Sequence, residues 1–551
     1  MKNILCLLSL LVLAGASAQE IGSPLDIPLF LSGNFCELRH NHFHSGLDIK
    51  TEGRAGLPVK AVKAGSISRI SVSPYGYGRA VYIRHPDGTT SVYGHLNNFI
   101  PAVESAVLDS QYRKESFSVD LQFSPGRFPV KQGEVFAFSG NTGGSGGPHL
   151  HFELRETASG KLIDPLPFFK GRIKDSRPPE IREIRLFPQP GRGLVSGKPE
   201  NRQLPFLKNK EGKQTPALLE AWGEIGAGIK AYDRMNGTSN IYGVNEIQLK
   251  VDGREIYHSV MDTLVLDNTR YINAFIDWTE WIENKSLFMK SFTEPGNRAG
   301  FNRSPGNGLI HITEEKNYHL EYLLKDVYGN SSRIAFTLVG KKAPLLPLPE
   351  NKTVFRQDRD NEYRGKGIEL KIPAGNLYSD LYFDPDTAGA LSPFSPLYLL
   401  GERIPLHSYT TLVLDITGDT CPDKTKYGVV QVYKKKKNWL GGEYRNGRIS
   451  VSIRELGCFS VETDTVSPVI TPLRPANWKT SGRISFKITD NLSGISSYRG
   501  TLDGQFILFE YDAKTNSLFA VYDPKRMKKS GSLEVVVTDA AGNETAYTGK
   551  F

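Results

Sequence analysis

Two distant stretches of the sequence carry the same short motifs in the same order. The segment Asp175-Ser-Arg-Pro-Pro-Glu-Ile181 matches Asp464-Thr-Val-Ser-Pro-Val-Ile470, and each stretch closes on an Asp-x-x-Gly-Asn motif. Between these ends, a Gly-Ile pair comes first and an Asp-Gly pair second: Gly228-Ile229 and Asp252-Gly253 in one stretch, Gly494-Ile495 and Asp503-Gly504 in the other. The closing motifs are Asp326 to Asn330 and Asp539 to Asn543. Such ordered correspondences predict two related β-sandwich modules, the first enlarged by an insertion around residues 255–310. Because each Asp-x-x-Gly-Asn motif offers one carboxylate, too few for calcium, it indicates a tight turn.

Both repeats resemble immunoglobulin-like domains of surface proteins, without the paired cysteines and core tryptophan of antibody domains. We place them at residues 175–340 and 464–551. Between them, the proline-rich segment Lys341-Lys-Ala-Pro-Leu-Leu-Pro-Leu-Pro349 marks a boundary that cannot continue a sheet. A third β-rich module of unassigned topology follows at residues 351–462.

The composition agrees with several β-rich domains. At about 150 residues per domain, 551 residues predict three or four of them. A hydrophobic fraction of 39% with 23% charged residues is ordinary for globular protein and argues against a disordered or collagen-like chain. The class expected is mainly β, with one N-terminal domain followed by three β-sandwich-like modules. The net charge of +9 suits an anionic envelope surface, and we expect no nucleic-acid partner.

The N-terminus reads as a signal peptide over residues 1–18. Lys2 supplies the positive charge, an apolar stretch follows, and Ala16-Ser-Ala18 is a small-residue cleavage site. The apolar stretch is too short to span a bilayer, so we expect an exported chain without a transmembrane segment after cleavage, in the periplasm, the cell envelope or outside the cell. A lipid anchor on Cys6 is disfavoured because that cysteine precedes the apolar core.

Export leaves three cysteines in an oxidising compartment. Cys421 and Cys458 could form a bridge, which would leave Cys36 free and buried.

Histidines gather near the front of the chain. Of 11 histidines, seven precede residue 152, so any chemistry is expected there. The same region has short segments of strand character: Ala80–Arg84 and Thr90–Tyr93 flank Asp87-Gly88 and predict a β-hairpin.

Three motifs around these histidines indicate a metal site. They are His44-Ser-Gly-Leu-Asp48, Tyr93-Gly-His95-Leu96 and Gly147-Pro-His149-Leu-His151-Phe-Glu153. In a strand His149 and His151 project from one face, and an extended segment places His44 and Asp48 on one side. Two histidines and one carboxylate suit Zn²⁺, with a fourth position left for water. Spacing alone leaves open whether His149 or His151 is the ligand.

These motifs and others in the same order resemble the M23 peptidases, the lysostaphin- and LytM-type zinc metalloendopeptidases that cut peptidoglycan peptides. The further motifs are Gly56-Leu-Pro-Val59, Ala61-Val-Lys-Ala-Gly65 and Ser139-Gly-Asn-Thr-Gly143. The resemblance covers roughly residues 35–168, about a quarter of the chain. It implies an antiparallel β-sheet peptidase domain at residues 19–170, with His44, Asp48 and His151 as zinc ligands and His95 and His149 as the catalytic pair.

The resemblance also implies the reaction. Zinc would activate a water molecule, a neutral histidine would accept its proton, and a peptide of peptidoglycan would be hydrolysed without a covalent intermediate. The alternative is a catalytically silent scaffold of the same fold that binds cell wall or activates another hydrolase, and a third reading is an adhesin. The β modules are expected to bind an envelope protein or polysaccharide.

Three further features have two readings each. An extra stretch from Pro101 to Arg127 could cover the substrate groove, but a decorating loop is the preferred reading. His40 and His42 could compete for metal, although solvated or supporting roles are more common. The run Lys434 to Lys437 could hold acidic polymer or lipid head groups, and a solvated hairpin end is preferred.

Overall fold

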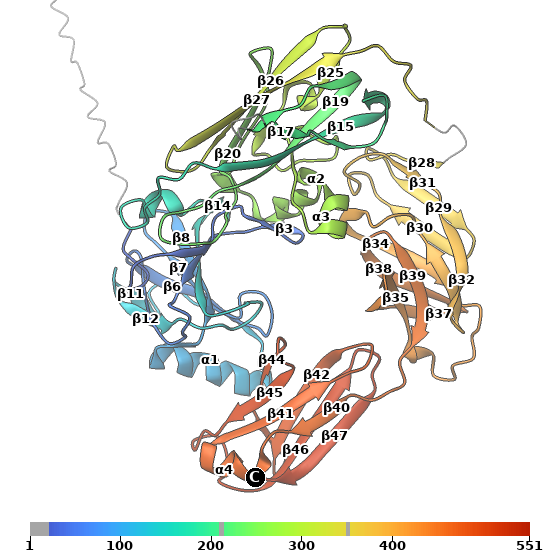
Figure 1. Ribbon diagram of the computed structural model, residues 1–551. Helices are drawn as coiled ribbons and strands as arrows, with labels where there is room; N and C mark the ends of the chain where they lie inside the picture. The colour runs from blue at the N-terminus through green and yellow to red at the C-terminus, as the bar shows by residue number, and fades with distance from the viewer. Residues whose placement is uncertain (1–20, 209–213, 349–352) are drawn as a thin grey trace, which may run out of the picture.

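The computed structural model describes residues 21–208, 214–348 and 353–551, so the predicted signal peptide lies outside the described residues. The chain forms four β-rich units in sequence: an N-terminal unit (β1–β14), a first repeat module (β15–β27), a middle module (β28–β39) and a C-terminal module (β40–β47). The C-terminal module returns to the N-terminal unit, so the chain closes into a ring (Figure 1). The expected class, mainly β with several β-sheet modules, is confirmed.

The N-terminal unit is built on a large antiparallel sheet. Its strands lie in the order β1 (Leu31–Gly33), β4 (Leu47–Lys50), β13 (His149–Glu156), β8 (Thr89–Leu96), β7 (Arg79–Arg84), β6 (Gly65–Val72) and β10 (Val119–Gln122). A second, small sheet contains β5 (Pro58–Lys60), β12 (Val135–Phe138) and β9 (Asn98–Phe99). The hairpin predicted around Asp87-Gly88 is confirmed as β7 and β8.

Strand register brings the three histidine motifs together. β13 lies between β4 and β8, so His151 is opposite Asp48 on one side and opposite Gly94 on the other. His95 follows Gly94 on β8, so the third motif lies next to the other two in the sheet. Side chains on a strand alternate between faces, so His149 and His151 share one face of β13, as predicted.

The segment from Pro101 to Arg127 differs from the preferred prediction of a loop. It contains the helix α1 (Pro101–Lys114) and the strand β10. Proline at the first helical position favours this start, because its missing N–H has no partner there in any case. Val103 and Val107, one turn apart, are fully buried and fix the helix to the unit.

The first repeat module is one sheet with an insertion. Its strand order is β16 (Arg202–Gln203), β15 (Glu180–Val195), β19 (Leu219–Tyr232), β27 (Ser331–Gly340), β26 (Asn317–Lys325), β20 (Glu246–Val251), β21 (Arg254–Val260) and β24 (Asn302–Arg303). The insertion holds β22 (Thr263–Leu264), α2 (Ile272–Phe275) and α3 (Trp278–Asn284). β22 extends the N-terminal sheet by pairing with β14 (Leu162–Ile163), and Trp278 donates to Arg403 O of the middle module at 2.9 Å. The predicted insertion therefore joins three units.

The middle module, left unassigned from sequence, has two five-stranded sheets. The first contains β29 (Asn361–Gly365), β30 (Ile368–Ile372), β34 (Pro405–Asp415), β38 (Arg448–Glu455) and β37 (Glu443–Arg445). The second contains β32 (Asp386–Ser392), β33 (Ser395–Leu399), β39 (Cys458–Thr463), β35 (Tyr427–Tyr433) and β36 (Lys436–Gly441). The lysine run forms the β35–β36 hairpin end, as preferred.

The cysteines within the described residues are free. Cys421 and Cys458, considered as a bridge, are both unbonded thiols, and Cys36 is free and buried as predicted.

The C-terminal module has two four-stranded sheets. They contain β40 (Val469–Pro472), β41 (Arg483–Thr489), β45 (Ser517–Val521) and β44 (Glu510–Asp512), then β43 (Gln505–Ile507), β42 (Ile495–Leu502), β46 (Ser532–Asp539) and β47 (Glu544–Lys550). The middle and C-terminal modules have separate hydrophobic cores, whereas one continuous core spans the N-terminal unit and the first repeat module.

The structure corrects one pair in the repeat. Gly228-Ile229 lies inside β19, whereas Gly494-Ile495 begins β42 after the Asp490 turn. The Asp-Gly and Asp-x-x-Gly-Asn turns do correspond, because they join β20 to β21 and β42 to β43, and β26 to β27 and β46 to β47. Among the described residues, no helix is both long and apolar enough to cross a membrane.

Candidate metal centre

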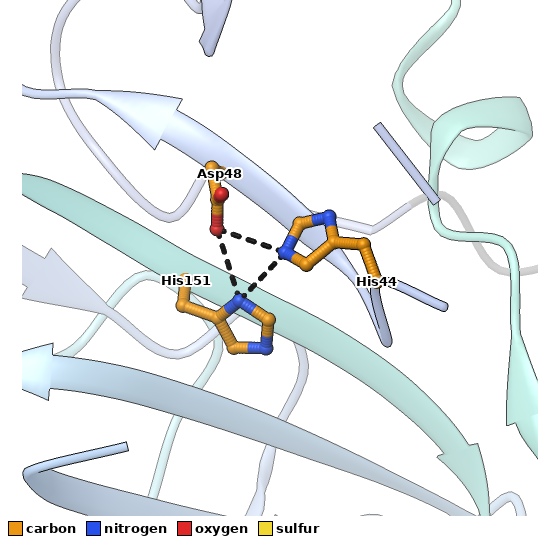
Figure 2. Close-up of side chains that lie close together, drawn as sticks. All are labelled: His44, Asp48 and His151. Carbon is orange, nitrogen blue, oxygen red and sulfur yellow. Dashed lines mark hydrogen bonds and ion pairs between the residues drawn. The ribbon is translucent and has the colours of Figure 1, made fainter. Parts of the chain in front are cut away.

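Three side-chain atoms converge on the face of the N-terminal sheet. His44 Nε2 is 3.0 Å from Asp48 Oδ1 and 3.1 Å from His151 Nδ1, and that nitrogen is 3.0 Å from the same carboxylate oxygen (Figure 2). The three residues are 6%, 7% and 3% exposed. Such a buried triangle of two imidazole nitrogens and one carboxylate oxygen places three donors around one point.

Each member of the triangle comes from a different local structure. Asp48 lies on β4 and His151 on β13, whereas His44 lies in the segment between β3 (His42–Phe43) and β4. The expected extended geometry from His44 to Asp48 is therefore replaced by a bend. Gly46 permits it, because a Cβ there would lie 2.1 Å from the carbonyl oxygen of Phe152.

Outer hydrogen bonds fix both ligand imidazoles. His44 Nδ1 donates to the carbonyl oxygen of Asn34 at 2.7 Å, and His151 Nε2 donates to Glu153 Oε1 at 2.9 Å. Ser45 and Tyr77 also donate to Glu153 Oε1, each at 2.5 Å. These bonds set the tautomers that leave His44 Nε2 and His151 Nδ1 free to bind a cation.

Arg39 orients the carboxylate. Its Nη2 donates to Asp48 Oδ2 at 3.0 Å, which leaves Oδ1 facing the histidines. Arg39 Nε also lies 3.2 Å from Glu37 Oε1, and burial raises the pKa of Glu37 to about 7. Asp48 is therefore positioned to offer one oxygen.

His95 and His149 lie beside the triangle. His95 Nδ1 donates to the carbonyl oxygen of Thr142 at 2.8 Å, and His149 Nδ1 donates to that of Gly147 at 2.8 Å. Their ring centroids are 4.7 Å apart, and His149 Nε2 is 3.3 Å from Asp48 Oδ1. Because the Nδ1–H of His95 is bonded to the backbone, its Nε2 remains as a proton acceptor, whereas His149 Nε2 faces the Asp48 carboxylate.

The electrostatics separate the histidines. Burial lowers the pKa of His95 to about 3, with the neighbouring His151 and His149 acting in the same direction. Burial also lowers the pKa of His44. Burial alone would lower the pKa of His151, but its bonds to Asp48 and Glu153 raise it to about 9. The metal-free centre thus holds one proton on His151, beside a neutral His95.

The donor set fits Zn²⁺. Two imidazole nitrogens, one carboxylate oxygen and fixed tautomers match a zinc site with an open position. The structure brings together all five residues predicted from the motifs, with the triangle formed by the three predicted ligands.

His40 and His42 lie outside the triangle. The His40 ring packs 6.0 Å from Trp278, and His42 Nδ1 donates to the carbonyl oxygen of His40 at 2.9 Å.

Four supporting residues had no assigned role at the sequence level: Asn34, Arg39, Tyr77 and Glu153. Strand alternation could have indicated Glu153, which is two positions beyond His151. Asn34 and Arg39 precede His44 by ten and five residues and Tyr77 lies farther along the chain, and none of them belongs to a motif that indicates its role.

Comparison with known proteins matches two parts of the chain to family models. Residues 42–111 match the model of Peptidase family M23, and residues 352–464 of the middle module match that of the Zu5-like domain. The chain therefore contains a segment that is similar to the M23 peptidases.

The relatives match this chain over a small part of its length. The DD-carboxypeptidase/endopeptidase Mpg of Neisseria meningitidis serogroup B is 33% identical over 123 residues, which are 22% of this chain and 22% of that protein. Lysostaphin of Staphylococcus simulans is 30% identical over 130 residues, 23% of this chain and 21% of that protein. The match spans about a fifth of each relative's length. The solved catalytic domain of lysostaphin has 27% identity and a TM-score of 0.19, covering 25% of this chain and 89% of that one.

Proposed function

We propose that this chain is an exported, zinc-dependent endopeptidase that hydrolyses cross-links or stem peptides of peptidoglycan. The observation that supports this most is the buried triangle of His44, Asp48 and His151 beside His95 and His149, whose Nδ1 atoms are bonded to backbone carbonyl oxygens. The substrate class is inferred from the relatives, since the ligand set specifies hydrolysis but not which amide is cut.

The residues divide the work of amide hydrolysis. His44, Asp48 and His151 would hold Zn²⁺, which supplies Lewis acidity for polarising a carbonyl and acidifying a water molecule. One of the pair His95 and His149 accepts the proton from the attacking water at its Nε2. The other, when protonated, donates to the oxyanion that develops on the scissile carbonyl.

The export, the Zn²⁺ and the roles of the β modules are part of the proposal. The signal-like N-terminus supports export to the periplasm or cell envelope. The modules after the peptidase domain are proposed to bind an envelope protein or polysaccharide, with boundaries at residues 175–340, 351–462 and 464–551.

The decisive experiment incubates the mature protein with purified sacculi, with and without a chelator, and identifies released products by mass. We expect cleaved peptides only when zinc is available. His149→Ala should lower kcat by about 10²- to 10⁴-fold while zinc stays bound, because it removes a proton carrier and not a ligand. His151→Ala should lose zinc and activity together.

His42→Ala is the matched control, since this exposed histidine lies outside the triangle, and it should cleave like the unaltered protein. A zinc-loaded protein that binds sacculi without releasing products would contradict the proposal and favour the silent scaffold.

A further inference from the structure

The C-terminal module reaches the catalytic part of the N-terminal unit through its β44–β45 hairpin. In Figure 1, β44 lies beside α1 although the two are about 400 residues apart in sequence. Lys514, in the hairpin turn, donates from Nζ to the carbonyl oxygens of Asn141 at 2.5 Å and of Gly143 at 3.1 Å. We propose that Lys514 is a positioning residue for the peptidase reaction, acting on His95 through this loop. The inference rests on the proposed function, because His95 has its role there.

The residue between the two carbonyls is the one that holds His95. Thr142 O accepts the Nδ1–H of His95 at 2.8 Å. The Thr142 hydroxyl donates to the carbonyl oxygen of Leu96 at 2.8 Å and accepts the amide N–H of Arg79 at 2.9 Å. Lys514 therefore fixes the loop on both sides of the carbonyl that sets the tautomer of His95.

His95 needs this support because its backbone is strained. Its φ of +57° lies in the left-handed region, which a non-glycine residue keeps only when its surroundings hold it. The amide N–H of His95 donates to Tyr77 O at 2.8 Å, so the loop and one neighbouring backbone group together hold the residue. A loosened loop would weaken the hydrogen bond that Thr142 O accepts from the imidazole and leave the bond of the His95 amide to Tyr77 O in place.

The C-terminal module also contacts α1, in the segment for which a loop was the preferred prediction. Tyr112 of α1 packs edge-on against Phe506 with ring centroids 5.7 Å apart. Arg79, whose side chain is 5% exposed, pairs with Glu104 of α1 at 2.9 Å and with Glu510 of β44 at 3.3 Å. Further ion pairs join Asp109 to Arg526 and Glu115 to Arg499.

These contacts place Lys514 at one end of an interface that begins on a helix and ends on the catalytic loop. The C-terminal module then acts in the same chain as a part of the catalytic apparatus, in addition to any envelope partner it binds.

The test compares three full-length, zinc-loaded variants on a soluble stem peptide. Lys514→Ala should lower kcat by about 10- to 100-fold with KM nearly unchanged, because it misplaces a proton carrier without removing a substrate contact. Lys514→Arg should recover most of the loss, since guanidinium N–H groups can reach both carbonyls. Lys528→Ala is the control, because Lys528 pairs with Asp503 inside the same module. It should behave as the unaltered protein.

Hydrogen exchange supplies a readout independent of catalysis. Amides of residues 139–148 should exchange faster in Lys514→Ala than in the unaltered chain, and Lys528→Ala should leave them unchanged. Equal kcat values for Lys514→Ala and the unaltered protein, or equal protection of this loop, would overturn the inference. If the unaltered protein is itself inactive with zinc bound, the proposed function fails, and loop exchange alone then decides whether Lys514 is a clamp.

Discussion

The imidazole of His151 depends on a carboxylate that is not itself a ligand. Glu153 is fully buried, and its Oε1 accepts the His151 Nε2–H. We predict that Glu153→Gln lowers zinc affinity by about 10- to 100-fold, because a neutral amide orients the ring and raises its basicity less well. Competition against a metal chelator measures this. Glu156→Gln, at the exposed end of the same strand, should leave affinity unchanged.

Zinc binding should also release a proton. The raised pKa of His151, about 9 against an ordinary 6.5, means that the metal-free protein holds this proton at neutral pH. A cation must displace it, so affinity should fall as the pH drops below 9. The same shift stabilises the metal-free fold fully below pH 6.5, and that contribution disappears as the pH rises through 9.

Calorimetry in two buffers of different ionisation enthalpy would measure the number of protons released. A binding enthalpy that is the same in both buffers at neutral pH would rule out this account.

The candidate metal ligands and candidate proton acceptors could be predicted from the sequence, but the groups that orient them could not. His44, His95 and His151 stand in short motifs whose residue types already indicate the chemistry. Their hydrogen-bond partners include the carbonyl oxygens of Asn34 and Thr142. Every residue has such an oxygen, so residue type cannot reveal which one is used.

Three aspartates lie close together in the connecting segments of the first repeat module. Asp175, Asp233 and Asp326 each place a carboxylate oxygen within 4.8 Å of the others. Asp326 accepts the amide N–H of Asn330 at 2.9 Å, which confirms the predicted tight turn. Burial and the neighbouring Asp326 raise the pKa of Asp233 to about 8.

This raised pKa costs stability at neutral pH. An unfolded Asp233 ionises near 3.8, whereas the folded one holds its proton up to about 8, so stability falls as pH rises between these values. Asp233→Asn should therefore raise the free energy of unfolding by about 1 to 3 kcal/mol at neutral pH and by much less in acid.

Calorimetric unfolding of chelator-treated protein tests this, since a bound divalent cation would offset the same charge. Glu200→Gln, at an exposed position of this module, is the control. A gain of stability equal in acid and at neutral pH would contradict the explanation.

Element types followed from sequence where the pattern was local. The β7–β8 hairpin and the turns of both repeats needed only nearby residues. The helix α1 was missed because a decorating loop was preferred on the ground that long loops vary easily. Its buried Val103 and Val107 and its contact with the C-terminal module account for the helix. The Gly-Ile pair was matched wrongly because a pair of residue types does not show whether it lies inside a strand, as Gly228-Ile229 does, or after a turn, as Gly494-Ile495 does.

For the whole molecule, closure of the ring relies partly on ion pairs that water reaches. Asp109 is half exposed in its pair with Arg526, and exposed pairs of this kind contribute about 0.2 to 1 kcal/mol each. Asp109→Lys should open part of the population, and high salt should do the same because it screens the pairs. Small-angle scattering would report a larger radius of gyration. Adding Arg526→Glu to Asp109→Lys restores opposite charges and should close the ring again; a double variant as open as the single one would refute the pairing.

The order of the units could be predicted from sequence, but their closure could not. The repeats and the proline-rich boundary can be recognised from consecutive residues, whereas the contact between α1 and the C-terminal module joins surfaces about 400 residues apart.

Because the chain itself connects both sides of the docking contact, the C-terminal module meets the peptidase domain at a high effective concentration, on the order of millimolar for a well-matched tether. A contact too weak to hold two separate proteins together can then stay formed. One cut in the proline-rich segment between Lys341 and Leu348 would leave every contact residue intact, but the pieces would then stay together only through noncovalent contacts, such as that of Trp278 with Arg403. If Lys514 has the proposed role, a protease acting on that segment would change the rate of the proposed peptidase reaction without contacting the site.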